Sequence, residues 1–88
     1  MPSAEFAALC KSLLLYSLDH RETPVSTHAP IMTIIPVLFP NLEIKMDLEK
    51  ASTVYWLSYT FIYGKSIDDV DINGFINALT FLFSTTTG

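Results

Sequence analysis

The segment from Leu48 to Tyr63 constrains the fold most, because it is apolar around most of its circumference when it is drawn as a helix. Asp47 is placed to cap its first turn, and Gly64 is placed to end it. At about 100° per residue the apolar arc spans roughly 220°, against a little over about 100° for a helix with one face toward a core. Such a helix is either central in the fold or shared with another subunit. A chain of 88 residues has little capacity to surround a central helix on its own.

A strand is the rival interpretation of this segment, since Thr53 to Tyr63 is rich in β-branched and aromatic residues. The helix is preferred for two reasons. Capping residues stand at both ends of the segment, and eleven apolar-rich residues without alternation are long for a strand.

Apolar periodicity and capping residues predict three further helices. They run from about Ala4 to Leu18, from about Pro30 to Phe39 and from about Asp71 to Ser84. Ser3 is the expected cap of the first helix. The second helix contains Pro36, which removes a backbone donor and therefore kinks the helix or splits it into two short pieces. The predicted fold is a single all-α domain over residues 1–88, with four helices and the second one kinked or split at Pro36.

Two of the connecting segments have distinct patterns. The polar stretch from His20 to Ala29 is typical of a loop, because Pro24 forbids a long regular element there. Leu42 to Met46 alternates apolar and polar residues, which is a strand pattern. Since a lone strand is not stable, this segment is either an extended connection or an edge that pairs with another segment or chain.

The composition excludes several classes of protein. Half of the residues are hydrophobic and only 16% are charged, which argues against a disordered tail. The net charge is −4 and the five basic residues are scattered, so nucleic acid is not an expected partner. The single cysteine, Cys10, cannot form an internal disulfide, which fits a reducing compartment. Without a good signal peptide at the N-terminus, a cytoplasmic protein is expected.

Two long uncharged runs raise the question of a membrane, Ala51 to Gly64 and Ile72 to Gly88. A spanning helix needs about 20 mostly apolar residues. The first run would reach only about 21 Å as a helix, and the second ends in polar residues. Both are expected to be buried helices of a domain that does not insert, with a small membrane-associated protein as an alternative.

The segment from Asp69 to Asn77 resembles the first nine positions of an EF-hand calcium loop, and resembles the dockerin version of that loop even more. Three ligand positions are filled by side chains that carry oxygen atoms: Asp69, Asp71 and Asn73. Gly74 stands at the turn of the loop, and Asn77 stands at its ninth position. The twelfth position is Thr80, where the family places an acidic ligand. A helix N-terminus rich in Asp caps is therefore expected, with a degenerate EF-hand-like calcium-binding domain as an alternative.

No catalytic, cofactor or metal site is predicted. His20 and His28 have no third ligand nearby, so they are expected to be solvated loop residues. Cys10 lies on the apolar face of the first helix and is expected to be a small buried hydrophobe. A pairing of Cys10 with His20 has no support from other residues. The chain contains no glycine-rich phosphate loop and no nucleophile elbow.

The aromatic residues of the segment from Leu48 to Tyr63 give the strongest indication of function. Tyr55, Tyr59 and Tyr63 are spaced by four, so they share one helix face, with Trp56 beside them. Tyrosine and tryptophan are enriched at interfaces, although they also occur in cores. The width of the apolar arc favours an interface, and Phe81, which points away from the main face of the last helix, is a second candidate. The predicted interface residues are Trp56, Tyr59, Tyr63 and Phe81.

These observations predict a non-catalytic protein–protein interaction or oligomerisation domain, an adaptor without a cofactor. The expected partners are a second copy of the chain, another protein, or both. Small domains of this kind are common among viral and phage accessory proteins, which is a statement about the class and not about these residues.

Overall fold

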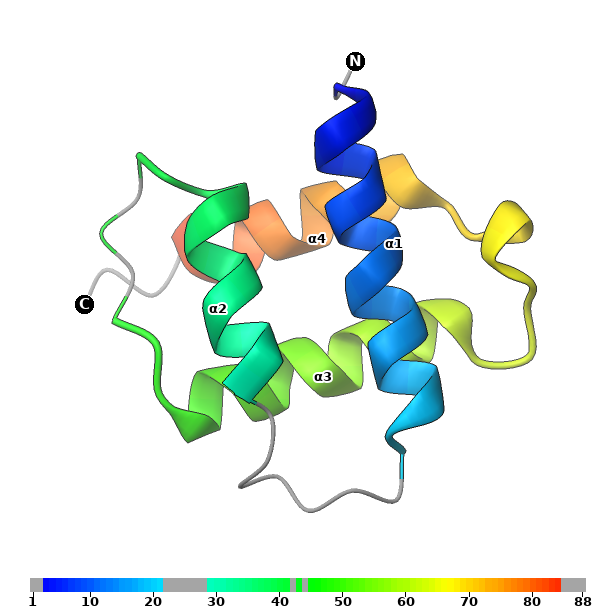
Figure 1. The fold of residues 1–88 in the computed structure, drawn as a ribbon, viewed down its shortest axis with the longest axis horizontal. Helices are drawn as coiled ribbons and strands as arrows, with labels where there is room; N and C mark the ends of the chain where they lie inside the picture. Colours follow the sequence, from blue (N-terminus) through cyan, green and yellow to red (C-terminus); the bar gives the residue numbers. More distant parts are fainter. Residues whose placement is uncertain (1–2, 22–28, 42, 44, 85–88) are drawn as a thin grey trace.

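The computed structural model describes residues 3–21, 29–41, 43 and 45–84, and within them the chain is all-α, as predicted (Figure 1). The regular elements there are α1 (Ala4–Asp19), α2 (Ala29–Leu38), α3 (Leu48–Ile62), the short 3-10 turn η2 (Ile67–Asp69) and α4 (Ile72–Ser84). In the view of Figure 1, α1 and α2 lie in front and run in opposite directions, and α3 and α4 cross behind them. α1 packs against the other three helices, and its most extensive contact is with α3.

Side-chain caps explain where three of the helices begin. In each case a serine or aspartate oxygen accepts a hydrogen bond from the backbone N–H three residues later, which satisfies a donor that has no partner within the helix. The cap and donor pairs are Ser3 and Phe6 at 3.1 Å, Asp47 and Lys50 at 2.8 Å, and Asp71 and Gly74 at 2.9 Å. The predicted starts of these helices are confirmed.

Gly64 ends α3, also as predicted. Its φ of +74° lies in the left-handed region, where glycine carries no steric penalty. The backbone N–H of Lys65 donates to the carbonyl of Ile62 at 2.9 Å and closes the last turn. The helical interpretation of the segment from Leu48 to Tyr63 is confirmed, and the rival strand is wrong.

Pro36 lies inside α2 without dividing it. The helix continues to Leu38, and the N–H of Phe39 still donates to the carbonyl of Ile35 at 3.0 Å. The alternative in which Pro36 splits this segment into two pieces is therefore wrong. Because proline has no backbone N–H, the carbonyl of Met32 lacks the donor that the helix would otherwise supply. A kink at Pro36 stays a prediction.

The two connecting segments are described only in part. Within the segment from His20 to Ala29, residues 22–28 lie outside the described residues, and so do the expectations for Pro24 and His28. Leu42 and Ile44 are also outside them. Their described neighbours Glu43, Lys45 and Met46 belong to no strand, so the strand interpretation of this segment has no support from the residues that are described.

Every α-helix contributes to one buried core. Fourteen hydrophobic side chains are buried among the described residues: Cys10, Leu13, Leu14, Ile31, Ile35, Leu38, Ala51, Val54, Tyr55, Ile62, Val70, Phe75, Leu79 and Phe83. Two buried serines, Ser17 and Ser58, satisfy their hydroxyls by donating to carbonyls of their own helices at 3.0 and 2.7 Å. The two serine hydroxyls are therefore buried in the core with a hydrogen-bond acceptor each.

Candidate interaction surfaces

The four predicted interface residues lie on two different parts of the molecule. Three of them lie along α3, and we call Trp56, Tyr59 and Tyr63 the aromatic surface. Trp56 is 52% exposed and Tyr63 is 67% exposed, whereas Tyr59 is half-buried. Phe81 is 70% exposed and lies on α4, beside a groove.

The rings of the aromatic surface hold one another in place. Tyr59 packs edge-on to Trp56 with ring centroids 5.8 Å apart, and its centroid lies 5.4 Å from that of Tyr63. On its inner side Tyr59 stacks on Tyr55 at 6.3 Å and an interplanar angle of 15°. Tyr55 is only 2% exposed, and burial, together with the neighbouring Tyr59 phenol, raises the pKa of its own phenol. The row of tyrosines therefore divides into a buried residue, a half-buried one and an exposed one, and Trp56 adds a second exposed ring beside it.

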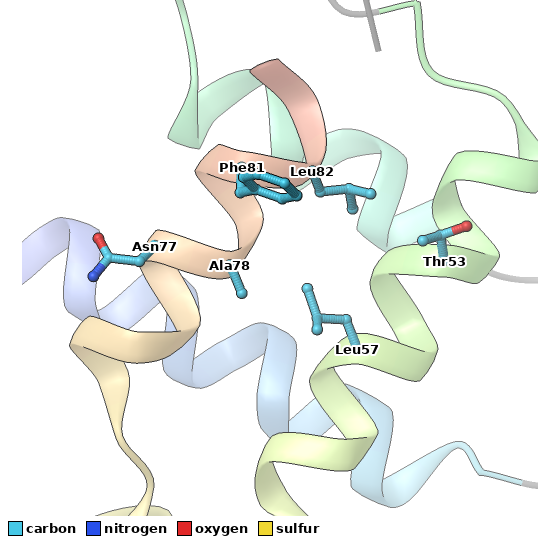
Figure 2. Close-up of a pocket in the computed structure, with 6 residues that line it drawn as sticks. All are labelled: Thr53, Leu57, Asn77, Ala78, Phe81 and Leu82. Carbon is cyan, nitrogen blue, oxygen red and sulfur yellow. The ribbon is translucent and has the colours of Figure 1, made fainter. Parts of the chain in front are cut away.

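The groove beside Phe81 lies between α3 and α4, and we call it the α3–α4 groove. It has a volume of about 480 Å³, and its lining residues are Thr53, Leu57, Asn77, Ala78, Phe81 and Leu82. Figure 2 shows Leu57 and Ala78 pointing toward each other from the two helices, with Phe81 along one edge. A smaller cavity of about 200 Å³ shares Thr53 and Leu82 with the groove and extends it to Glu49, Lys50 and Phe83. The groove is thus apolar in the middle and bordered by one acid and one base at an end.

Phe81 is the one lining residue of this groove that was predicted at an interface, and Leu57 is a large apolar lining residue that was not. On the helical wheel Leu57 lies among the polar residues of α3. In the structure it is half-buried and packs against the core. A large apolar residue among the polar positions of the helix was the feature of the sequence that could have indicated a binding surface there. Phe81 gives the same signal on α4, and the structure shows that both residues line one groove.

The segment from Asp69 to Asn77 does not form an EF-hand-like loop. Asp69 lies in η2 and accepts a hydrogen bond from the Ser66 hydroxyl at 2.9 Å, while Asp71 caps α4. Asn73, Gly74 and Asn77 lie within α4. Gly74 is explained by the cap, since a Cβ there would lie 2.3 Å from an oxygen of the Asp71 carboxylate. In the residues that the structure describes, no three His, Cys, Asp or Glu side chains gather as a metal site requires.

Cys10 and His20 do not form a catalytic pair. Cys10 is fully buried, and burial raises the pKa of its thiol to about 11, so the thiolate is not formed near neutral pH. The Nδ1 atom of His20 lies 2.9 Å from the carbonyl oxygen of Tyr16, and its ring stacks on the Tyr16 ring at 4.1 Å. Nine residues of α1 lie between Cys10 and His20, which places the two about 15 Å apart along the helix axis.

Within the described part of the chain, no helix combines the length and the apolar character needed to span a membrane. Comparisons with protein-family models, with curated proteins and with solved structures give no match to this chain. The aromatic surface and the α3–α4 groove are therefore the features of the molecule from which a function can be argued.

Proposed function

We propose that this chain is a non-catalytic interaction domain that associates with a second copy of itself through the aromatic surface of α3. One observation carries the proposal: Trp56 and Tyr63 are more than half exposed, and both rings pack against Tyr59. Tryptophan and tyrosine are enriched among the residues that dominate protein interfaces.

Order in the free protein favours binding at this surface. Immobilising a flexible side chain at an interface costs about 0.5–1.5 kcal/mol. Tyr59 stacks on the buried ring of Tyr55 and also contacts the rings of Trp56 and Tyr63, which restricts the rotamers open to these side chains. Less of the association energy is then spent on ordering these rings.

The charge around the aromatic surface favours a second copy as the partner. No charged residue occurs between Ala51 and Gly64, although the whole chain has a net charge of −4. Two copies that meet at this segment therefore bring together no like charges on it, and the repulsion between two acidic chains acts only at longer range, where salt screens it.

The test is the solution mass of a double variant, Trp56→Glu with Tyr63→Glu. We expect the wild type to be larger than a monomer at tens of micromolar. The double variant should stay folded, since both side chains are exposed, and should lose the association that this surface provides. Val37→Glu is the matched control, because Val37 is 59% exposed but lies on α2. Light scattering coupled to size exclusion gives the mass, and circular dichroism reports the fold. An unchanged mass in the folded double variant would refute the proposal.

A further inference from the structure

We propose that the second copy binds along α3 in the antiparallel direction, about a two-fold axis that passes beside Trp56. This arrangement rests on the proposed function, to which it adds the orientation and register of the partner. It uses five residues that we call the α3 stripe: Leu48, Ser52 and the three residues of the aromatic surface. Leu48 is 46% exposed and Ser52 is half-buried. At 100° per residue all five lie within an arc of about 80°, so the stripe follows one side of the whole helix for about 22 Å.

The spacing of the α3 stripe matches its own reverse. Its members are separated by four, four, three and four residues, and the reversed order is four, three, four and four. To within one residue, an antiparallel copy centred on Trp56 therefore places Leu48 opposite Tyr63 and Ser52 opposite Tyr59. The two Trp56 rings meet at the axis. Each small or aliphatic member then faces a tyrosine of the other copy, which is the alternation that lets the side chains of facing helices interdigitate.

A parallel copy would pair every member of the α3 stripe with itself. Ser52 would face Ser52, which leaves the stripe unfilled at that level while Tyr59 faces Tyr59. The acids at the start of the helix, Asp47 and Glu49, would also lie at the same level as their own copies, and like charges that meet at an interface are unfavourable. The parallel arrangement is therefore poorer in both packing and charge.

Charges at the two ends of α3 favour the antiparallel copy. Glu49 and Lys65 are exposed, and neither forms an ion pair with a residue that the structure describes. The register set by the stripe brings Lys65 of one copy to within two residues of the level of Glu49 of the other, which is about 3 Å along the axis. The same contact forms twice about the axis. The acid Asp47, which pairs with Lys50 of its own chain at 3.7 Å, is not needed for it. The acids of η2 lie off the axis of α3, because the chain turns away after Gly64 (Figure 1).

Disulfide trapping measures which positions meet in the dimer. Leu48→Cys and Tyr63→Cys are prepared separately, because both side chains are exposed and each variant should stay folded. They are mixed in equal amounts at tens of micromolar in a glutathione buffer, where disulfide exchange lets proximity decide the product. The two variants differ in mass, so mass spectrometry separates the three disulfide dimers. We expect about nine-tenths of these dimers to join position 48 to position 63, against half for random pairing.

The controls use the protein's own surface and core. The wild type is the blank, because its single cysteine, Cys10, is buried. Val37→Cys is the matched control, since Val37 is 59% exposed but lies on α2. Leu48→Cys alone and Tyr63→Cys alone should each give no more disulfide dimer than Val37→Cys, because in an antiparallel dimer neither position meets its own copy.

Charge reversal gives a second readout of the same register. In the antiparallel dimer Glu49→Lys alone and Lys65→Glu alone each bring like charges together, and an equimolar mixture of the two variants restores both ion pairs. We expect each variant to raise the dimer dissociation constant at least about threefold and the mixture to return it close to the wild-type value. In a parallel dimer each residue faces its own copy, so a single reversal would leave the dissociation constant unchanged.

The outcomes separate this register from the proposed function. Disulfides that join like positions, or no more disulfide than Val37→Cys gives, overturn the antiparallel register when the protein is a dimer by mass, and they leave the proposed function in place. A mixture of the charge variants that dimerises no better than either variant alone also overturns it. The proposed function fails separately, through a monomeric wild type or through an unchanged mass in the folded double variant Trp56→Glu with Tyr63→Glu.

Discussion

Leu57 of α3 and Phe81 of α4 line the same groove, although Leu57 is half-buried against the core and Phe81 is 70% exposed. An apolar residue at a polar helix position is usually a single exposed side chain without consequence. Here the two exceptions meet, because α3 and α4 both lie behind α1 and leave a groove between them. The pairing gives one physical origin to two separate departures from helical periodicity.

Phe81 and Phe83 provide a matched test of where the core ends. Phe83 is 3% exposed and its ring lies 5.8 Å from that of Phe39, whereas Phe81 is 70% exposed. We expect Phe83→Ala to lower the free energy of unfolding by about 3–5 kcal/mol, because it leaves a cavity. Phe81→Ala should change it by less than about 0.5 kcal/mol. Urea denaturation at low protein concentration, where association contributes little, measures both values. Equal losses in the two variants would contradict the assignment of Phe81 to the surface.

Most of the helical architecture could be predicted from the sequence, since it depends on local chemistry. Ser3, Asp47 and Gly64 act through hydrogen bonds and φ values within a few residues, which the sequence displays directly. The effect of Pro36 was harder to judge, because it depends on how many helical residues follow the proline. Only the structure shows that α2 ends two residues later.

The candidate surfaces could be predicted only in part, because exposure depends on how the helices pack. Tyr55 and Tyr59 share a helix face in the sequence, yet in the structure Tyr55 is buried and Tyr59 is half-buried. Trp56 and Tyr63 were predicted at an interface, and their exposure is compatible with that prediction. The groove depends on the separation of α3 and α4, which no local pattern encodes.

The cap of α3 predicts a dependence of stability on acid. The hydrogen bond from the backbone N–H of Lys50 holds the pKa of the Asp47 carboxyl below its ordinary value, and the Lys50 ammonium, 3.7 Å away, acts in the same direction. The unfolded chain has a carboxyl pKa of about 3.9. Because the pKa of Asp47 is lower in the folded protein, its charge adds to the free energy of unfolding at pH values above the pKa of the unfolded chain. This stabilisation is lost as the pH falls through the pKa of the folded protein.

Asp47→Asn tests this dependence, because asparagine caps a helix about as well as aspartate but does not ionise in this range. We expect the wild type to be more stable than the variant at about pH 6 and to lose that advantage by about pH 2.5. Urea denaturation at the two pH values gives the comparison. An advantage of the wild type that stays constant with pH would show that the charge of Asp47 is not involved.

Cys10 predicts chemical protection that depends on the fold. Its thiol is fully buried with a pKa of about 11, against about 8.5 for a free cysteine. Alkylation by iodoacetamide near pH 8 should therefore be at least about 100-fold slower in the folded protein than in urea. Because the unfolded thiol loses its proton first, the free energy of unfolding should also fall as the pH rises above about 8.5. Cys10→Ala, which cannot be alkylated, is the blank for the labelling. Rapid labelling without denaturant would place Cys10 at the surface.

Thr80→Glu tests whether a missing ligand is all that separates the segment from Asp69 to Thr80 from a calcium site. The substitution restores an acid at the twelfth position of the EF-hand pattern. We expect neither the wild type nor the variant to show a rise in melting temperature with millimolar calcium. The reason is geometric: Asn73, Asn77 and Thr80 belong to one continuous helix, so their side chains project outward along α4 and do not converge on a central ion. Opening that helix would also break the Asp71 cap, which contributes about 1 kcal/mol to stability.

The measurement is a thermal melt of both proteins with calcium and with a chelator. A rise in Thr80→Glu that disappears when Asp69 is changed to Ala would show that the segment can unwind to form a calcium loop.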